Sequence, residues 1–159
     1  MSFDAIKRAD HTKGNKEDHT KLGYGPNGET KTYKIRVTEM RGKEEPEPPV
    51  MPWVAIDFVV IESDNDEQPE GTEAGHAWTV GGEWGHLGFQ DLKAFLAMAL
   101  DLDTVKAREI DRSVVLFCTG DDQPVAGAEF IATVSRQVRG PKSKKAGEPF
   151  AKVHFKKAS

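Results

Sequence analysis

The chain has 159 residues and a formal net charge of −4, with 37% hydrophobic and 30% charged residues. This length fits one domain with a terminal arm. The single cysteine, Cys118, excludes an internal disulfide and therefore a secreted fold held together by such bonds. No apolar run approaches the roughly 20 residues of a membrane-spanning helix, and the N-terminus lacks the apolar core of a signal peptide. We therefore expect a soluble cytoplasmic protein that does not contact membranes.

Charge is unevenly distributed along the chain. Residues 44–135 carry 19 acidic and four basic side chains, a net charge of −15. Residues 136–159 carry eight basic side chains and one acidic side chain, a net charge of +7. A nucleic-acid binder needs a local basic surface rather than a basic total. The last 24 residues can supply such a surface.

Residues 1–30 contain few apolar side chains and end in a turn-forming run, 23–28. We expect a flexible N-terminal arm over 1–30, with a short helical turn near Phe3–Arg8. Residues 31–159 are expected to form the folded domain.

Three strands are predicted in the first half of this domain. Apolar and polar side chains alternate cleanly over residues 32–38, which indicates a half-buried strand. The second strand covers 53–62 and the third covers 76–80, the latter ending at Gly81. The loop over 44–52 contains four prolines, and the loop over 63–75 is acidic.

The period of the pattern then changes from 2 to 3.6. Apolar side chains at helical spacing predict a helix over 88–101, with Asp91 and Lys93 away from its apolar side. A second short helix can begin at Asp103 or Thr104. The run 114–118 is predicted as a strand or a buried extended segment. A hairpin follows, with strands over 130–139 and 150–156 and a loop over 140–147.

Three strands, a helix and a final hairpin are the element order of the OB-fold, a small five-stranded barrel. We therefore predict a mainly β fold, a five-stranded OB-type β-barrel with one capping helix between strands 3 and 4. An α+β sandwich built from the same elements is the competing architecture.

Candidate catalytic and metal sites are weak throughout. The five histidines show no ligand spacing, and the run Asp64-Asn65-Asp66 lacks the glycine and distant glutamate of a calcium loop. The glycine-rich run 81–88 lacks the Gly-Lys-Ser/Thr ending of a phosphate-binding loop. Cys118 has no neighbouring base in the sequence. We expect no enzyme activity, no metal and no cofactor.

The basic hairpin is the main functional signal. Clustered cations repel one another unless an anion compensates, and phosphate backbones do so with release of counterions. A hairpin edge protected from aggregation by lysines is the alternative. Together with two cations of the first strand, the candidate phosphate contacts are Lys34, Arg36, Arg139, Lys142, Lys144, Lys145, Lys152 and Lys156.

Exposed aromatic rings are the second requirement, because the bases of a single strand stack on them. Trp53 lies on the less buried face of its predicted strand, and Trp78 and Trp84 flank the glycine-rich run. Trp53 and Trp78 are the candidate stacking residues. Each tryptophan can instead belong to the core, where large aromatic side chains are usually placed.

The chain resembles bacteriophage single-stranded-DNA-binding proteins in the order of its segments. These segments are the strands Tyr33-Lys34-Ile35-Arg36-Val37 and 53–63, the run Gly75-His76-Ala77-Trp78, the helix 91–96 and the closing run Lys152-Val153-His154-Phe155. The resemblance covers residues 31–157. It implies an OB-fold that coats unwound DNA during phage replication or recombination, in the host cytoplasm. Many such proteins end in an acidic tail that recruits partners, whereas this chain ends Lys156-Lys157-Ala158-Ser159. Either the acidic region 44–75 recruits replication or recombination proteins instead, or the protein is not a replication hub.

We therefore expect a largely sequence-independent binder of single-stranded DNA that forms homo-oligomers. The sequence does not separate DNA from RNA as the ligand. The alternative is a phage structural, assembly or adaptor protein that acts through self-association, in which the oppositely charged regions 44–135 and 136–159 pair between subunits.

Overall fold

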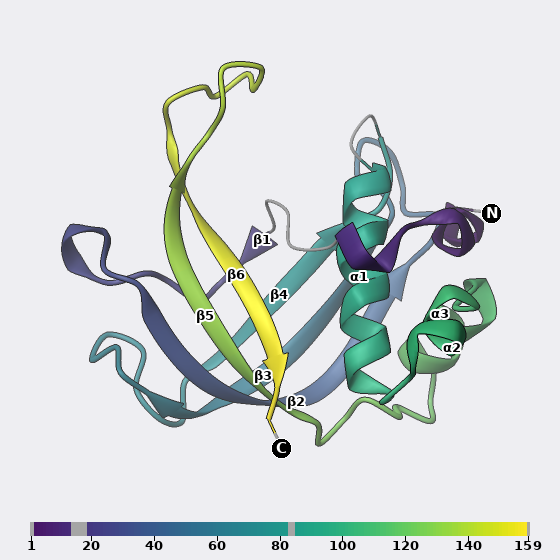
Figure 1. Ribbon diagram of the computed structural model, residues 1–159, viewed down its shortest axis with the longest axis horizontal. Coiled ribbons are helices and arrows are strands. Elements are labelled where there is room, and N and C mark those ends of the chain that lie inside the picture. Colours follow the sequence, from purple (N-terminus) through teal and green to yellow (C-terminus); the bar gives the residue numbers. More distant parts are fainter. Residues whose placement is uncertain (1, 14–18, 83–84, 159) are drawn as a thin grey trace.

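The computed structural model describes residues 2–13, 19–82 and 85–158 (Figure 1). The N-terminal segment contains the 3-10 helices η1 (Ser2–Arg8), η2 (His11–Lys13) and η3 (Pro26–Gly28) and the two-residue strand β1 (His19–Thr20). The longer elements are β2 (Lys31–Lys43), β3 (Trp53–Ser63), β4 (Glu73–Thr79), α1 (Gly85–Ala99), α2 (Thr104–Arg108), α3 (Arg112–Thr119), β5 (Glu129–Val138) and β6 (Pro149–Lys157). The five predicted strands are confirmed, with β2 and β4 longer than expected.

All strands belong to one antiparallel sheet in the order β1-β4-β3-β2-β5-β6. The fold is thus mainly β, with five long strands, and the prediction is confirmed at this level. The sheet is not closed into a barrel, because among the described residues no ladder joins β6 to β1 or β4. Figure 1 shows that the sheet is strongly curved, with the β5–β6 hairpin rising beyond its main body.

Strand β2 is the centre of the sheet and pairs with both β3 and β5. Its register with β3 shifts between Lys34 and Ile35 and again between Val37 and Glu39. Such bulges bend a strand and increase its twist. Because β5 pairs only with residues 31–36 of β2, the bent strand can continue beside β3 while β5 and β6 turn away.

The helical region confirms the predicted helix α1 and the predicted second short helix, α2, which Asp103 caps, but it contains more than the single capping helix of the predicted fold. Three α-helices lie between β4 and β5, and the run 114–118 is part of α3 rather than a strand or an extended segment. Asp111 caps α3, since its carboxylate accepts hydrogen bonds from the backbone N–H groups of Ser113 and Val114. Only Val115 and Cys118 of α3 are buried, and they are three residues apart, as on one side of a helix. The sequence does not show this helical spacing, because all five residues from 114 to 118 are apolar.

The core joins α1 to the two ends of the curved sheet. The ring centroid of Phe95 in α1 lies 4.9 Å from that of Trp78 in β4, 4.7 Å from Phe130 in β5 and 5.4 Å from Phe155 in β6. Offset and edge-on rings at such distances attract one another beyond the area they bury. Helix α1 therefore connects β4 to the β5–β6 hairpin where backbone pairing does not.

The prediction that Asp91 and Lys93 lie on an exposed polar side of α1 is wrong, because both side chains are buried. The Lys93 ammonium group donates hydrogen bonds to the backbone carbonyls of Lys7, Ala9 and Arg108, at 2.8, 3.0 and 3.2 Å. These carbonyls lie at or just beyond the ends of η1 and α2, where helices leave acceptors unused. The hydrophobic periodicity of α1 alone could not predict the burial of Lys93, because its hydrogen-bond acceptors belong to η1, the residue after η1, and α2.

The N-terminal segment contributes to this core. Phe3, Ile6 and Leu22, all within the predicted arm, are at most 2% exposed. Glu44 accepts a hydrogen bond from the backbone N–H of Phe3 at 2.9 Å and pairs with the Arg112 guanidinium. Hydrogen bonding to Arg112 holds the pKa of Glu44 below its usual value. Parts of residues 1–30 are thus attached to the domain.

We predict that Lys93→Met lowers the free energy of unfolding by about 2–4 kcal/mol, because hydrogen bonds from a charged donor are lost and three acceptors remain without it. The measurement is urea unfolding followed by circular dichroism. Lys106→Met removes an exposed lysine of α2 and serves as the control, for which we expect a change of about 0.5 kcal/mol or less. Equal stability of the two variants would contradict the structural role of Lys93.

Candidate nucleic-acid interface

The alternation of β6 separates its cations from the core. Val153 is buried and Phe155 packs against Phe95, whereas Lys152 and Lys156 point to the opposite side of the sheet. Successive side chains of a strand point to opposite faces. We call the side of the sheet away from α1 the outer face. Lys157 lies on the α1 side, where its ammonium group pairs with Asp101 at 2.8 Å.

The hairpin loop, residues 139–148, carries the most accessible cations. Lys142, Lys144 and Lys145 are exposed, and among the described residues none of them is in an ion pair. Figure 1 shows the loop at the far end of the hairpin, away from the helices. Three unpaired ammonium groups on a projecting loop can contact an extended polyanion without desolvating the core.

The outer face brings further predicted cations together. Lys34 and Lys156 are both register partners of Ile131, so two strand spacings of about 4.8 Å separate them. Arg36 lies beside them but is partly neutralised, since its guanidinium donates to the Glu129 carboxylate at 2.9 and 3.0 Å. Lys34 Nζ lies 3.8 Å from the same carboxylate. One glutamate thus offsets two of the candidate phosphate contacts.

The tryptophans divide differently from the prediction. Trp78 is 1% exposed and packs against Phe95, so its assignment as a stacking residue is wrong. Trp78 is two residues after His76, so the alternation of β4 directs both side chains to the core-facing side, and both are buried. Trp53 is partly exposed at the start of β3. Trp84 lies outside the described residues.

Two pairs of an arginine and an aromatic ring lie outside the core. The Arg41 guanidinium carbon lies 5.3 Å from the Trp53 ring centroid, and that of Arg139 lies 5.0 Å from the centroid of Phe150. The sequence reasoning missed Arg41 and Phe150. The alternation of 150–156, which already placed Lys152 on the outer face, could have identified Phe150 as a ring on that face.

An open groove of about 670 Å³ lies over β3 and β4 and is bordered by Thr20 and Lys21 at β1 and by Ala151 of β6. Ala55, Gly75 and Ala77 give it small side chains, Arg41 lines one part, and Ala151 comes from β6. We call it the outer groove. Arg41, which lines the groove, also lies over the Trp53 ring. Trp53 is at the opposite end of β3 from Glu62, the register partner of Lys34.

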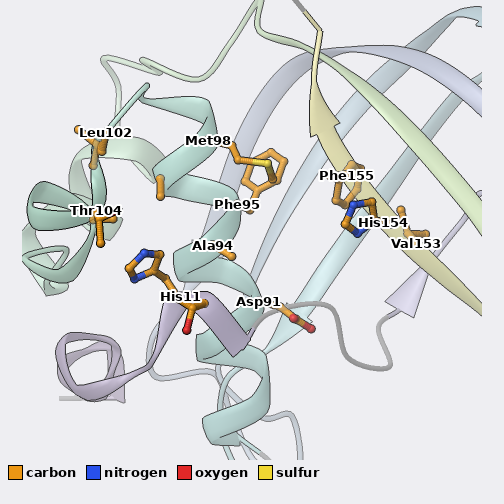
Figure 2. Close-up of a pocket in the computed structure, with 13 residues that line it drawn as sticks. His11, Asp91, Ala94, Phe95, Met98, Leu102, Thr104, Val153, His154 and Phe155 are labelled. Carbon is orange, nitrogen blue, oxygen red and sulfur yellow. The ribbon is translucent and has the colours of Figure 1, made fainter.

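A second hollow of about 400 Å³ lies between α1 and β6 (Figure 2). Its lining is mostly apolar, with Ala94, Phe95 and Met98 from α1, and Figure 2 shows His11 and His154 on opposite sides of it. Among the described residues that line it, there is no lysine or arginine. This hollow therefore does not suit a phosphate.

Burial keeps two titratable groups, Cys118 and His76, in their neutral forms near neutral pH. Burial raises the pKa of the Cys118 thiol to about 11, so the nucleophilic thiolate is scarce near neutral pH. Burial likewise lowers the pKa of His76 to about 3, which keeps its imidazole neutral. In residues 2–13, 19–82 and 85–158, no three His, Cys, Asp or Glu side chains are grouped so that they could hold a metal ion.

Comparison with models of protein families, with curated proteins and with solved structures found no match for this chain. None of the helices in the described part of the chain is both long and apolar enough to cross a membrane.

If the outer face binds single-stranded DNA, Glu129→Gln should strengthen that binding about three- to tenfold at low salt, because Arg36 and Lys34 become available to phosphates. The salt dependence should steepen by about 0.7 to 1.4 in the slope of log K against log salt. Fluorescence anisotropy with an oligo-dT strand measures both quantities. Glu109→Gln removes an exposed carboxylate after α2 and should change neither. Equal effects of the two variants would contradict a specific role for Glu129.

Proposed function

We propose that this protein binds single-stranded DNA, largely without sequence preference, on its outer face and hairpin loop. The observation that carries the proposal is the gathering of cations there: Lys142, Lys144 and Lys145 are exposed on the loop, and Lys152 and Lys156 lie along the same side of β6. The net charge of −4 does not oppose this, because a local surface rather than the total decides binding.

The strand arrangement supports an OB-type fold. The three antiparallel strands β2, β3 and β4 are followed by helices and then by the β5–β6 hairpin, which pairs back onto β2. OB-folds are partly open barrels that bind oligonucleotides on the face of their second and third strands and on the loops joining strands 1–2 and 4–5. Here these features correspond to the β3–β4 face, which contains the outer groove, and to the hairpin loop.

Stacking would use Trp53 and Phe150. Each ring is accompanied by an arginine, and arginine planes and aromatic rings both accept the face of a base. Because every base has such a face, stacking tolerates any sequence. The phosphates would follow Lys34, Arg36, Arg139, Lys152, Lys156 and the loop lysines.

The resemblance to phage single-stranded-DNA-binding proteins suggests a role in phage replication or recombination. Exposed carboxylates of region 44–75, among them Glu45, Asp66 and Glu70, would be available to recruit basic surfaces of replication or recombination proteins. Glu44 is less suited, since it is already paired with Arg112.

We predict that reversing the loop charges in Lys142→Glu, Lys144→Glu and Lys145→Glu together weakens binding about tenfold or more, equally for oligo-dT and for mixed sequences. The physical reason is the loss of phosphate neutralisation. Anisotropy titrations at about 50 mM and 200 mM salt measure the affinity and its salt dependence.

The matched control reverses Lys7, Lys106 and Arg108, which are exposed in η1 and α2. It makes the same change in net charge on the helical part of the molecule and should weaken binding much less. Absence of binding by the unaltered protein at 50 mM salt would remove the proposed function. Equal losses in both triple variants would show that only total charge matters.

A self-associating structural or assembly protein is the second candidate. It is favoured by apolar side chains on the helices: Val105 is 63% exposed, Leu116 39% and Phe117 50%. An exposed apolar patch commonly marks a protein interface. The acidic and basic regions of neighbouring subunits could then pair around it.

If α3 mediates self-association, Phe117→Asp should reduce the particle to a single chain, because a carboxylate cannot be buried in an apolar contact at low cost. Light scattering after size-exclusion chromatography measures the mass. A single-chain mass for the unaltered protein across the accessible concentrations would exclude this candidate.

A further inference from the structure

The outer groove has features that phosphate binding does not require. Its floor contains Ala55, Gly75 and Ala77, small residues that leave room for a planar group. Asp57 and Glu73 also line it. Carboxylates repel phosphates, so a strand in this groove would place its backbone along the cations and turn its bases toward the floor.

A glycine keeps the space beside Asp57 open. Gly75 is the register partner of Asp57 on the neighbouring strand. A Cβ atom at position 75 would lie 3.4 Å from Asp57 Oδ1 and 3.1 Å from the backbone oxygen of Ile56. Without that atom, the carboxylate borders free space within the groove.

Arg41 fixes the orientation of this carboxylate. Its Nε donates to Asp57 Oδ2 at 2.9 Å and its Nη2 to Oδ1 at 3.3 Å, while the guanidinium also covers the Trp53 ring. An ionised carboxylate has about four acceptor positions. Arg41 uses two of them, so Asp57 can accept further hydrogen bonds from the groove.

We infer that Asp57 accepts a hydrogen bond from the exocyclic amino group of a base held in the outer groove, which adds to the otherwise sequence-tolerant binding a preference for cytosine and adenine over thymine at this one position. This inference rests on the proposed function. Cytosine carries an amino donor where thymine carries a carbonyl oxygen. Single-stranded bases expose these edges to a protein. The thymine carbonyl oxygen carries a partial negative charge, so the negatively charged Asp57 carboxylate would repel it.

The test compares labelled oligo-dC and oligo-dT strands of about 15 nucleotides by anisotropy at one salt concentration. The two pyrimidines have rings of the same size, so stacking and phosphate contacts are matched. We expect oligo-dC to bind about tenfold more tightly, the effect of one hydrogen bond to a charged acceptor. Asp57→Asn should reduce this ratio to about one, since an amide also donates to the thymine carbonyl.

Asp121→Asn is the matched control, because it removes an equal charge from an exposed turn outside the groove. It should leave the ratio of the two affinities unchanged. Equal binding of oligo-dC and oligo-dT by the unaltered protein overturns the inference while the proposed function stands, and so does a cytosine preference that persists in Asp57→Asn. Failure to bind either strand at 50 mM salt removes the proposed function itself.

Discussion

The packing of Phe95 against rings from three strands is the contact on which the geometry of the molecule depends. Because no backbone ladder among the described residues closes the sheet, β4 and the β5–β6 hairpin are joined by side chains: Phe95 of α1 contacts both, and the His76 ring of β4 lies 4.9 Å from the Phe155 ring of β6. Trp78, Phe130 and Phe155 all meet Phe95 on the concave side. The same alternation that directs these rings inward directs Lys152 and Lys156 outward. The position of the cations is therefore a consequence of the aromatic core.

This arrangement explains how an acidic chain can present a surface suited to a polyanion. Carboxylates dominate residues 44–135, yet the exposed residues Lys142, Lys144 and Lys145 belong to the loop of the β5–β6 hairpin, which projects from the sheet (Figure 1). The outer face also contains its own counter-charges, Glu129 beside Arg36 and Asp57 beside Arg41. Such ion pairs weaken attraction for phosphate, but they also hold guanidinium groups in defined orientations beside Trp53 and the central strand. Under the proposed function, affinity for phosphate and selectivity for a base would thus be set at different positions.

The sequence was sufficient to predict a structural feature where that feature depends on the pattern within a single strand or helix. Alternation identified the five long strands, and the helical period identified α1. It failed where burial depends on partners distant in the chain: Lys93 is buried because carbonyls of η1 and α2 receive its protons, and Trp78 is buried because Phe95 lies above it. The segment 114–118 failed for a different reason, since its consecutive apolar residues have no readable period and the Asp111 cap decides the helix. For the candidate site, the alternation of β6 is sufficient to place Lys152, Lys156 and Phe150 on one face, whereas the placement of Arg41 and the groove depends on cross-strand register.

The central claim is that a single strand of DNA lies on the outer face and the hairpin loop, and amide chemical shifts report its location most directly. In a titration of the isotope-labelled protein with oligo-dT, the account predicts that the largest changes occur over residues 139–156 and around Arg41 and Ala55. Amides of α2 and α3 should remain unchanged. Changes confined to α2 and α3, or to the hollow between α1 and β6, would contradict it.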